Sequence, residues 1–450
     1  MRHLILGSSA AGVAAAEILR KNRPDDEIIM ASADGHIHSR CLLYRYLSGE
    51  RDIESLDFTE RNFFDHYNIK LILNSPAISI DIEKKSVNFE NGPITYDRLL
   101  ITTGARCFIP DISGLRKAKN VYTLGCIDDA AKIKETAKTS DLIAILGSGV
   151  IGMGAANSFI RSGWHKKRPA KMASRAIHVI EMADRIIPLQ LDHYVSKLYQ
   201  ERFEANGVKF HISKQAQAVT LYEDGRVAAL EFDSREMLPC DMIIVAAGNR
   251  PNTRFLENSG IKLEKSRENG VAVDKYMQTT VKDVYAAGDV TGITGNWYAA
   301  VKQGRVAAHN MAETKKLTEI TYEDKFHSSN SINYVGLTTV SVGKVSPPFE
   351  EEGCQVHEYQ YGKKNLKLVT KDNLVVGALI HGDISNVGHW HYMIKNKVPL
   401  GNMAKAPVLA EYADYFEIDQ ETMEFRYRIG DVDSSERTYK NFIYENFAKN

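Results

Sequence analysis

Cys41 is the residue whose surroundings most clearly suggest redox chemistry. It stands in the stretch SRCLLYRYLSG, residues 39–49, directly behind Arg40, whose charge would lower the pKa of the thiol and favour the thiolate. A thiolate at this position would cycle through a sulfenate or a mixed disulfide with a small thiol. The alternative role is structural, because Leu42 and Leu43 follow and a buried free cysteine commonly behaves as a small hydrophobic residue. We favour the structural role, and the choice depends on which cofactors lie nearby.

A first glycine-containing loop begins at residue 7, within the stretch HLILGSSAAGVAAAEILRKN. Gly7 and Gly12 fit the tight turn and the close helix–strand packing of a dinucleotide-binding fingerprint, in which the pyrophosphate lies on the helix N-terminus. Ser9 replaces the middle glycine, and its hydroxyl could donate a hydrogen bond to a phosphate. The ribose partner expected at the end of the next strand is Ser32 or, slightly later, Asp34.

A second loop carries the complete GxGxxG pattern at Gly147, Gly149 and Gly152, directly after an apolar run. A later apolar run ends in Glu181, whose carboxylate would accept hydrogen bonds from the adenosine ribose hydroxyls and repel a 2′-phosphate. NADH is therefore favoured over NADPH. A basic insertion, residues 164–175, lengthens the spacing to Glu181; we interpret it as a solvated loop, the alternative being a docking surface for an acidic partner.

Apolar strands must position these loops. Besides the runs before the two loops, YDRLLITTGA (96–105) and DMIIVAAGNRPN (241–252) break into glycine turns. Apolar runs without polar alternation are typical of central strands in parallel sheets that are covered on both faces. The stretch VYAAGDVTG places Gly288 and Asp289 at a further strand end, where an aspartate can hold a ribityl hydroxyl of a flavin.

The composition predicts a soluble, cytoplasmic protein of two or three domains. The 450 residues include 57 basic and 57 acidic side chains, so the formal charge gives no reason to expect nucleic acid or an anionic membrane as partner. Five scattered cysteines without a CxxC pair indicate reduced thiols. Residues 142–160 carry no charge, but their glycines fit a dinucleotide loop better than a membrane span. Glu17 interrupts the apolar stretch after the first strand, so no signal peptide is expected.

The histidines do not predict a metal site. His389 and His391 are two positions apart, so they face opposite ways on a strand and share no face of a helix. No cysteine or carboxylate cluster completes a site around them. His36 and His38 flank the Cys41 stretch, either near a flavin or as ordinary loop residues. The stretches KKSVNFENG and YEDGR are interpreted as hairpin turns.

Together these stretches resemble the two-dinucleotide-binding-domain flavoproteins of the pyridine nucleotide–disulfide oxidoreductase superfamily. The resemblance rests on the order of the parts: the first loop, TTG (102–104), the second loop, AAGNRPN and AAGDV. The stretch AVKQGRVAAHN (300–310) resembles the family's helix under the flavin. The chain is most similar to the nitrite reductase, rubredoxin reductase, NADH oxidase and coenzyme-A-disulfide reductase branches, which place an SR-x-LL segment next to the flavin ring. Residues 326–450, above all 372–400, resemble their C-terminal interface domain.

The resemblance implies an α/β fold with two Rossmann-like domains and a C-terminal α+β interface domain. The expected FAD-binding domain comprises residues 1–112 and 244–325, the NAD(P)-binding domain 113–243, and the interface or dimerisation domain 326–450. FAD is the implied cofactor, with NAD(H) preferred over NADP(H). The family also implies a homodimer, or a subunit of a larger complex.

The resemblance also implies which residues contact the cofactors, with Cys41 as the candidate catalytic residue. Those expected at FAD are Gly7, Ser9, Ala10, Ala11, Gly12, Ser32, Arg40, Cys41, Thr103, Gly104, Ala105, Gly288 and Asp289. Those expected at NAD are Gly147, Gly149, Val150, Ile151, Gly152, Glu181 and Gly248.

Several positions depart from the family pattern. Ala10 stands where NADH peroxidases carry a histidine, which argues against peroxidase activity. Gly154 and Arg45 stand where some relatives pair a glutamate with a lysine near the flavin, which leaves open how the nicotinamide is guided. Relatives with the SR-x-LL frame often carry proline in place of Cys41, and Leu42 replaces the glycine that follows the cysteine in NADH oxidases.

Three functions remain after this comparison. The favoured one is an FAD-dependent NAD(P)H oxidoreductase that passes electrons to a redox protein or to a partner dehydrogenase subunit. With a dehydrogenase subunit the electron flow could also reverse, so that NAD⁺ is reduced. The first alternative is a thiol-dependent NADH oxidase, or a disulfide, persulfide or polysulfide reductase, that uses Cys41. The second alternative is a flavoprotein whose role is mainly binding or regulation.

Overall fold

The computed structural model describes residues 1–166, 175–293, 295–312, 321–322, 329–346, 353–362 and 364–400, together with Leu409 and the backbone of two short strands. The chain divides into two compact units. The first comprises Met1–Ile187 and Gln200–Asp324, and the second comprises Pro188–Tyr199 and Lys325–Asn450. Most of the basic insertion predicted at 164–175 lies outside the described residues.

The first unit contains a five-stranded parallel sheet built from the apolar runs that the sequence indicates. Its strand order is β20-β7-β1-β2-β3, and every neighbouring pair is parallel. The strands are β1 (Arg2–Leu6), β2 (Glu27–Ala31), β3 (Ile69–Ile72), β7 (Arg98–Ile101) and β20 (Val284–Ala286). The three inner strands, β1, β2 and β7, are buried except at the first residues of β1 and β2, as expected for a sheet that is covered on both faces.

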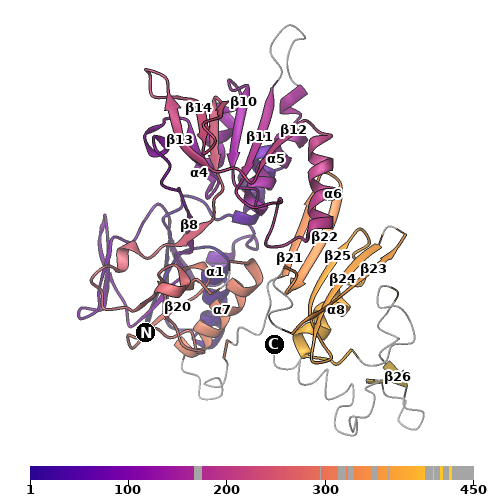
Figure 1. The fold of residues 1–450 in the computed structure, drawn as a ribbon. Coiled ribbons are helices and arrows are strands. Elements are labelled where there is room, and N and C mark those ends of the chain that lie inside the picture. Colours follow the sequence, from indigo (N-terminus) through magenta and orange to yellow (C-terminus); the bar gives the residue numbers. More distant parts are fainter. Residues whose placement is uncertain are drawn as a thin grey trace. The chain divides into compact units, whose positions relative to one another are not determined.

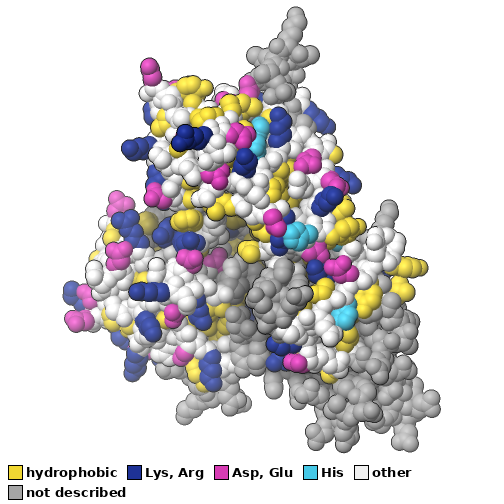
Figure 2. All heavy atoms as spheres, in the orientation of Figure 1, with side chains coloured by type: hydrophobic (Ala, Val, Ile, Leu, Met, Phe, Trp, Pro, Cys, Tyr) yellow, Lys and Arg dark blue, Asp and Glu magenta, His cyan; other side chains and the backbone are white. Residues whose placement is uncertain are grey.

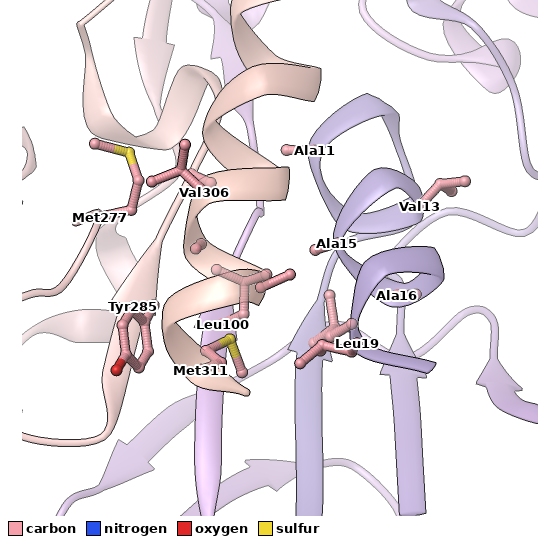
Figure 3. Close-up of a cluster of buried hydrophobic side chains, with 14 of the residues drawn as sticks. Ala11, Val13, Ala15, Ala16, Leu19, Leu100, Met277, Tyr285, Val306 and Met311 are labelled. Atoms are coloured by element: carbon pink, nitrogen blue, oxygen red, sulfur yellow. The ribbon is translucent and has the colours of Figure 1, made fainter. Parts of the chain in front are cut away.

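Helices α1 (Ala10–Asn22) and α7 (Trp297–Met311) lie side by side against this sheet (Figure 1). Figure 3 shows Ala11 and Ala15 of α1 lying between the two helices, with Leu100 of β7 below them. A Cβ atom at Gly304 of α7 would lie 2.2 Å from the carbonyl oxygen of Ala11. Small residues therefore allow the two helices to pack at close range, which fixes the first glycine loop relative to α7.

The other face of this sheet carries smaller β elements. Strands β4 (Ser79–Asp81), β5 (Ser86–Phe89) and β6 (Gly92–Thr95) form an antiparallel meander, which confirms the hairpin turns expected in KKSVNFENG. Val87 and Phe89 of the meander are buried against the sheet. The same unit contains two short ribbons, one of β18 (Leu263–Glu264) with β19 (Gly270–Val271) and one of β8 (Ala105–Cys107) with β17 (Asn249–Pro251).

A second five-stranded parallel sheet in the same unit has the order β12-β11-β10-β16-β9. Its strands are β9 (Val121–Thr123), β10 (Leu142–Leu146), β11 (Ala176–Glu181), β12 (Val208–Ile212) and β16 (Met242–Val245). Helices α4 (Ile127–Thr136) and α5 (Val150–Arg161) accompany it, with α2 (Leu43–Ser48) and the short α3 (Phe63–His66) elsewhere in the unit. An antiparallel meander of β13 (Ala216–Leu221), β14 (Val227–Phe232) and β15 (Met237–Pro239) includes the turn expected at YEDGR.

The uncharged stretch 142–160 is thus strand β10, the second glycine loop and most of helix α5. Across the described parts of the chain, no helix is both long and apolar enough to span a membrane. The glycines of this uncharged stretch therefore mark the turn between a strand and a helix.

The second unit is built on an antiparallel sheet of order β21-β22-β25-β24-β23. Its strands are β21 (Ser329–Tyr334), β22 (Leu337–Gly343), β23 (Gln355–Tyr361), β24 (Lys364–Lys371) and β25 (Leu374–His381). Helix α8 (Val387–Asn396) packs Trp390 and Met393 on one face. A separate pair of strands consists of β26 (Phe416–Ile418) and β27 (Phe425–Tyr427).

The segment 188–199, which includes the start of helix α6 (His193–Glu204), belongs to this second unit. The Tyr199 hydroxyl donates to the carbonyl oxygens of Ile332 or Leu337, at 3.0 and 3.1 Å. Lys367 Nζ lies 3.3 Å from Asp192 Oδ2, and both side chains are only 10% exposed. Polar contacts as well as apolar packing therefore join this segment to the sheet.

The fold class predicted from the sequence is confirmed: two Rossmann-like parallel sheets and a C-terminal α+β region. The predicted domain boundaries stay a prediction. Strand β16 crosses the boundary expected between residues 243 and 244, and the segment 188–199 of the expected NAD(P) domain groups with the C-terminal region. On the face that Figure 2 shows, basic and acidic side chains are interspersed, in keeping with a formal charge of zero.

Candidate functional site

The first glycine loop joins β1 to α1, and its two glycines are required by backbone packing. Gly7 has φ +114°, and a Cβ there would lie 2.2 Å from the carbonyl oxygen of Thr102. A Cβ at Gly12 would lie 2.1 Å from the carbonyl oxygen of Gly7. Ser9 is the N-cap of α1, and among the described residues its side chain caps no backbone N–H. The helix N-terminus is therefore available for an anion.

The second glycine loop joins β10 to α5 and repeats this geometry. Gly147 has φ +102°, and a Cβ at Gly152 would lie 2.0 Å from the carbonyl oxygen of Gly147. Gly149 differs, because a Cβ there would meet no described atom within 4 Å and its φ of −64° suits any residue. Nothing in the described protein requires a glycine at this position. The open space above Gly149 therefore fits the close approach of a pyrophosphate.

Polar groups meet at the carboxyl ends of strands β2 and β11, the strands that follow the two glycine loops in the chain. The Ser8 hydroxyl donates to Ser32 Oγ at 2.8 Å, and Ser32 is nearly fully buried. At the second loop, Ser148 donates to Glu181 Oε2 from its backbone N–H at 2.9 Å and from its hydroxyl at 2.7 Å. The backbone N–H of Ala183 donates to Glu181 Oε1 at 2.8 Å. A hydroxyl thus follows strand β2 and a carboxylate ends strand β11, and their contact with a ribose stays a prediction.

Gly288 and Asp289 follow strand β20 in a short 3-10 turn, Asp289–Thr291. The N–H of Gly288 donates to Gln303 Oε1 at 2.8 Å. Gln303 is fully buried, and its amide Nε2 has no hydrogen-bond partner among the residues that the structure describes. Burial raises the pKa of the Asp289 carboxyl, while the positive charge of Arg40 acts in the opposite direction.

Arg40 begins the 3-10 turn Arg40–Leu42, and its Nη1 donates to the carbonyl oxygen of Ala105 at 2.7 Å. Its guanidinium also lies near the Gly104 turn, since a Cβ there would come within 3.8 Å of Nη1. The structure therefore joins the stretch that carries Cys41 to the turn after strand β7. The sequence placed these residues at one site but did not indicate this contact.

Cys41 itself is exposed, so it does not fill a core position as the structural role would require. Although the residue is exposed, enough protein surrounds the sulfur that desolvation raises the pKa of the thiol, and the Asp289 carboxylate raises it further. Arg40 lowers the pKa but does not outweigh these effects. The direction of this shift in pKa favours the thiol over the thiolate, and the role of Cys41 stays a prediction.

The turns after β7 and β16 hold each other in place. Asn252 Nδ2 donates to the carbonyl oxygen of Thr103 at 2.9 Å, and the Thr103 hydroxyl donates to the carbonyl oxygen of Asn252 at 3.0 Å. The N–H of Asn252 donates to the carbonyl oxygen of Gly104 at 2.9 Å, and that of Phe108 donates to Gly248 at 2.8 Å. The stretch AAGNRPN therefore fixes the TTG turn of the first sheet.

Helix α2, directly after Cys41, packs against α5. The Ser158 hydroxyl of α5 lies 2.6 Å from the carbonyl oxygen of Tyr44, and Arg161 forms an ion pair with Glu50. Arg45, expected where relatives carry a lysine, donates from Nε to the Tyr44 hydroxyl at 3.1 Å. Hydrogen bonding and an ion pair thus hold α2 against α5.

The described part of the chain contains no group of three or more His, Cys, Asp or Glu side chains that could hold a metal ion. His389 and His391 both lie on helix α8, two residues apart. His38 is buried, and its Nε2 finds no partner within the described residues.

FAD fits the residues of the first site. The free N-terminus of α1 and the Ser9 hydroxyl suit a pyrophosphate, and the unpaired Nε2 of Gln303 is a buried donor that a bound group would satisfy. Sequence reasoning missed Gln303 and Ser148. The only sequence signals for them were the glutamine in AVKQGRVAAHN and the shared Gly-Ser step of the two loops.

Two parallel sheets, each with a glycine loop at the start of a helix, define a flavoprotein with two dinucleotide-binding sites. Residues 1–304 match the family profile described as pyridine nucleotide-disulphide oxidoreductase. The chain belongs to this family, and its two glycine loops fit FAD and a nicotinamide dinucleotide.

Two relatives and one solved structure illustrate the similarity. The NAD(P)H nitrite reductase of Bacillus subtilis is 29% identical over 415 residues, which cover 90% of this chain and 48% of that protein. The NADH oxidase of Methanocaldococcus jannaschii is also 29% identical over 415 residues, covering 85% of this chain and 88% of that protein. The chain thus spans about half the length of the first relative and most of the second.

The solved structure of an NAD-dependent persulfide reductase from A. fulgidus aligns with a TM-score of 0.77 at 24% identity. The alignment covers 90% of this chain and 80% of that chain. This similarity shows that the fold is shared.

Proposed function

We propose that the chain takes a hydride from NADH and passes two electrons to a redox protein or to a partner subunit. The acceptor would be a rubredoxin, a ferredoxin or an iron–sulfur dehydrogenase, and with a dehydrogenase the flow could reverse and reduce NAD⁺. Bound FAD supplies the redox chemistry, since it can accept a hydride and release two electrons. The protein supplies the binding sites and their alignment.

The observation that carries this proposal is the pair of matching glycine loops within one compact unit. Both loops have positive-φ first glycines, and in both the last glycine packs on the carbonyl of the first. Each loop starts a helix of at least 12 residues, whose N-terminus favours a phosphate. These matching loops support a site for an electron donor and a site for a flavin within the same unit.

Glu181 supports NADH as the donor. A carboxylate at the end of β11 would accept a hydrogen bond from a ribose hydroxyl and would repel a 2′-phosphate. The ion is ready for this role because Ser148 and Ala183 donate to it. NADP(H) is therefore expected to bind less well.

The raised pKa of Cys41 supports an exit for electrons that does not depend on a thiolate. The relation to the nitrite reductase points the same way. That protein is about twice as long as the part that this chain matches, so the matching region is joined there to further chain. For this protein we propose a separate partner that receives the electrons, in a homodimer or a larger complex in the cytoplasm.

The variant Cys41→Ser tests this proposal. Reduction of an artificial dye by NADH, and reduction of the native acceptor once it is identified, should stay within about twofold of the wild type. Cys126→Ser, at the N-cap of α4, is a matched control for loss of a thiol. Loss of turnover with the native acceptor in Cys41→Ser alone would overturn the proposed route.

A thiol-dependent route through Cys41 is the second candidate, because the side chain is exposed and thus accessible to a small disulfide or persulfide. This candidate predicts a long-wavelength charge-transfer band between thiolate and flavin after addition of two electrons. A flavin spectrum that does not change between wild type and Cys41→Ser would argue against it.

A further inference from the structure

Ser148 lies between the first two glycines of the second loop and is fully buried. Its backbone N–H and its hydroxyl both donate to the same oxygen of Glu181, Oε2, at 2.9 and 2.7 Å. The N–H of Ala183 donates to the other oxygen at 2.8 Å. The carboxylate at the end of β11 is therefore held by three donors from two segments of the chain.

These three donors leave little freedom to the carboxylate. An ionised carboxylate offers about four lone-pair positions. With three of them filled, about one remains for a ligand hydroxyl, and the plane of the group is set. Hydrogen bonds to a charged acceptor are short and strong, so each donor contributes to this orientation. Of the three, only the Ser148 hydroxyl belongs to a side chain.

The backbone of Ser148 is fixed from its other side as well. Its carbonyl oxygen accepts a hydrogen bond from the N–H of Ile187 at 3.0 Å. Ile187 is fully buried with φ +49°, a conformation that a β-branched residue rarely adopts. Such a conformation persists only where the surrounding structure holds it. Ser148 is thus positioned before any nucleotide binds.

The first loop contains the same arrangement with a different end group. Ser8 occupies the position that corresponds to Ser148, and its hydroxyl donates to Ser32 Oγ at 2.8 Å. In both loops the serine after the first glycine donates to a residue at the end of the strand that follows the loop, Ser32 directly after β2 or Glu181 as the last residue of β11. The partner is an uncharged hydroxyl in the first loop and a carboxylate in the second, and only a carboxylate would repel a 2′-phosphate.

We propose that Ser148 is a positioning residue that determines the preference for an unphosphorylated adenosine ribose by holding the Glu181 carboxylate in place. This inference rests on the proposed use of NADH. Without the hydroxyl, Glu181 keeps two backbone donors but gains rotational freedom. Its charge then faces the ribose for less of the time, so discrimination against a 2′-phosphate weakens.

Direct binding of ligands without a nicotinamide ring tests this role apart from turnover. ADP-ribose and 2′-phospho-ADP-ribose are titrated calorimetrically into the FAD-loaded wild type, Ser148→Ala and Ser148→Gly. The glycine variant adds no atoms to the packed loop, which covers the case in which alanine impairs folding. Ser140→Ala is the matched control, since Ser140 is equally buried and its hydroxyl donates to the carbonyl oxygen of Thr136 at 3.0 Å.

The expected result is a preference for ADP-ribose in the wild type that falls about 5- to 10-fold in both Ser148 variants and is unchanged in Ser140→Ala. If both ligands lose affinity equally, Ser148 has only a structural role and the inference is wrong. The inference about Ser148 is also wrong if the variants keep the wild-type preference for ADP-ribose over 2′-phospho-ADP-ribose. In that case the proposed use of NADH still stands. A wild type that does not prefer ADP-ribose contradicts the proposed donor itself, and the inference fails with it.

Discussion

Alanine substitutions at Gly152 and Gly149 should affect different properties, although both glycines belong to one fingerprint: the first should lower stability and the second should lower nucleotide affinity. At Gly152 the new Cβ would lie 2.0 Å from the carbonyl oxygen of Gly147 and 3.3 Å from the Cβ of Ala246. Since the first contact is with backbone, the loop or helix α5 must shift by more than an ångström. Overpacking of this kind costs about 3 kcal/mol of unfolding free energy.

At Gly149 the same change meets no described atom within 4 Å, and the backbone there is acceptable to alanine. Alanine is a poorer N-cap than glycine, but it also restricts the unfolded chain, so the net change in stability should stay within about 1 kcal/mol. The added methyl occupies the space that a pyrophosphate needs. We expect at least a tenfold loss of affinity for ADP-ribose, which corresponds to about 1.4 kcal/mol.

Thermal unfolding and calorimetric titration with ADP-ribose separate the two effects. Gly295→Ala is the matched control, because Gly295 is an open glycine with ordinary φ outside both loops. It should change neither stability nor binding. Gly149→Ala that binds ADP-ribose as tightly as the wild type would refute the assignment of the open space to the nucleotide.

Two further predictions concern stability. Lys367→Met leaves Asp192 as a buried charge without its ion-pair partner and should lower the free energy of unfolding, measured with a chemical denaturant, by about 3 kcal/mol. Lys84→Met removes an exposed ion pair and should have no measurable effect. Equal effects of the two substitutions would contradict the role of burial. Burial beside His211 lowers the pKa of His178 from 6.5 to about 4. The unfolded chain therefore takes up a proton at this residue below pH 6.5, whereas the folded protein does so only near pH 4. The stability that the neutral histidine contributes above pH 6.5, at most about 3 kcal/mol, is lost as the pH falls toward 4. His178→Gln, which keeps a hydrogen-bond partner for His211 but does not titrate, should flatten the decline of the melting temperature over this range, and an unchanged slope would exclude His178 as its source.

The glycine loops were predictable because phosphate binding constrains the backbone locally. Gly7 and Gly147 need positive φ, and Gly12 and Gly152 need contact with a backbone carbonyl only a few residues away. Such requirements leave a pattern within one short stretch of sequence. The parallel strands were predictable from their apolar runs, which are also local patterns, whereas the fold class was implied by the resemblance to a known family.

Contacts between distant parts of the chain were not predictable. Leu42 and Leu43 suggested a buried environment for Cys41, yet only Leu43 is buried and the cysteine is exposed on a short 3-10 turn. The pKa of Cys41 depends on Asp289, which only the tertiary fold brings near. Gln303 was overlooked for the same reason, since its acceptor role at Gly288 depends on the packing of α7 beside β20.

The central claim is that one chain holds FAD and accepts electrons from NADH without a reactive thiolate. Anaerobic titration of the FAD-loaded protein with NADH and then NADPH, for wild type and Cys41→Ser, tests it most directly. We predict full bleaching of the flavin by one equivalent of NADH in both proteins, with slower reduction by NADPH. A flavin that NADH fails to reduce, or that it reduces only when Cys41 is present, would contradict the account.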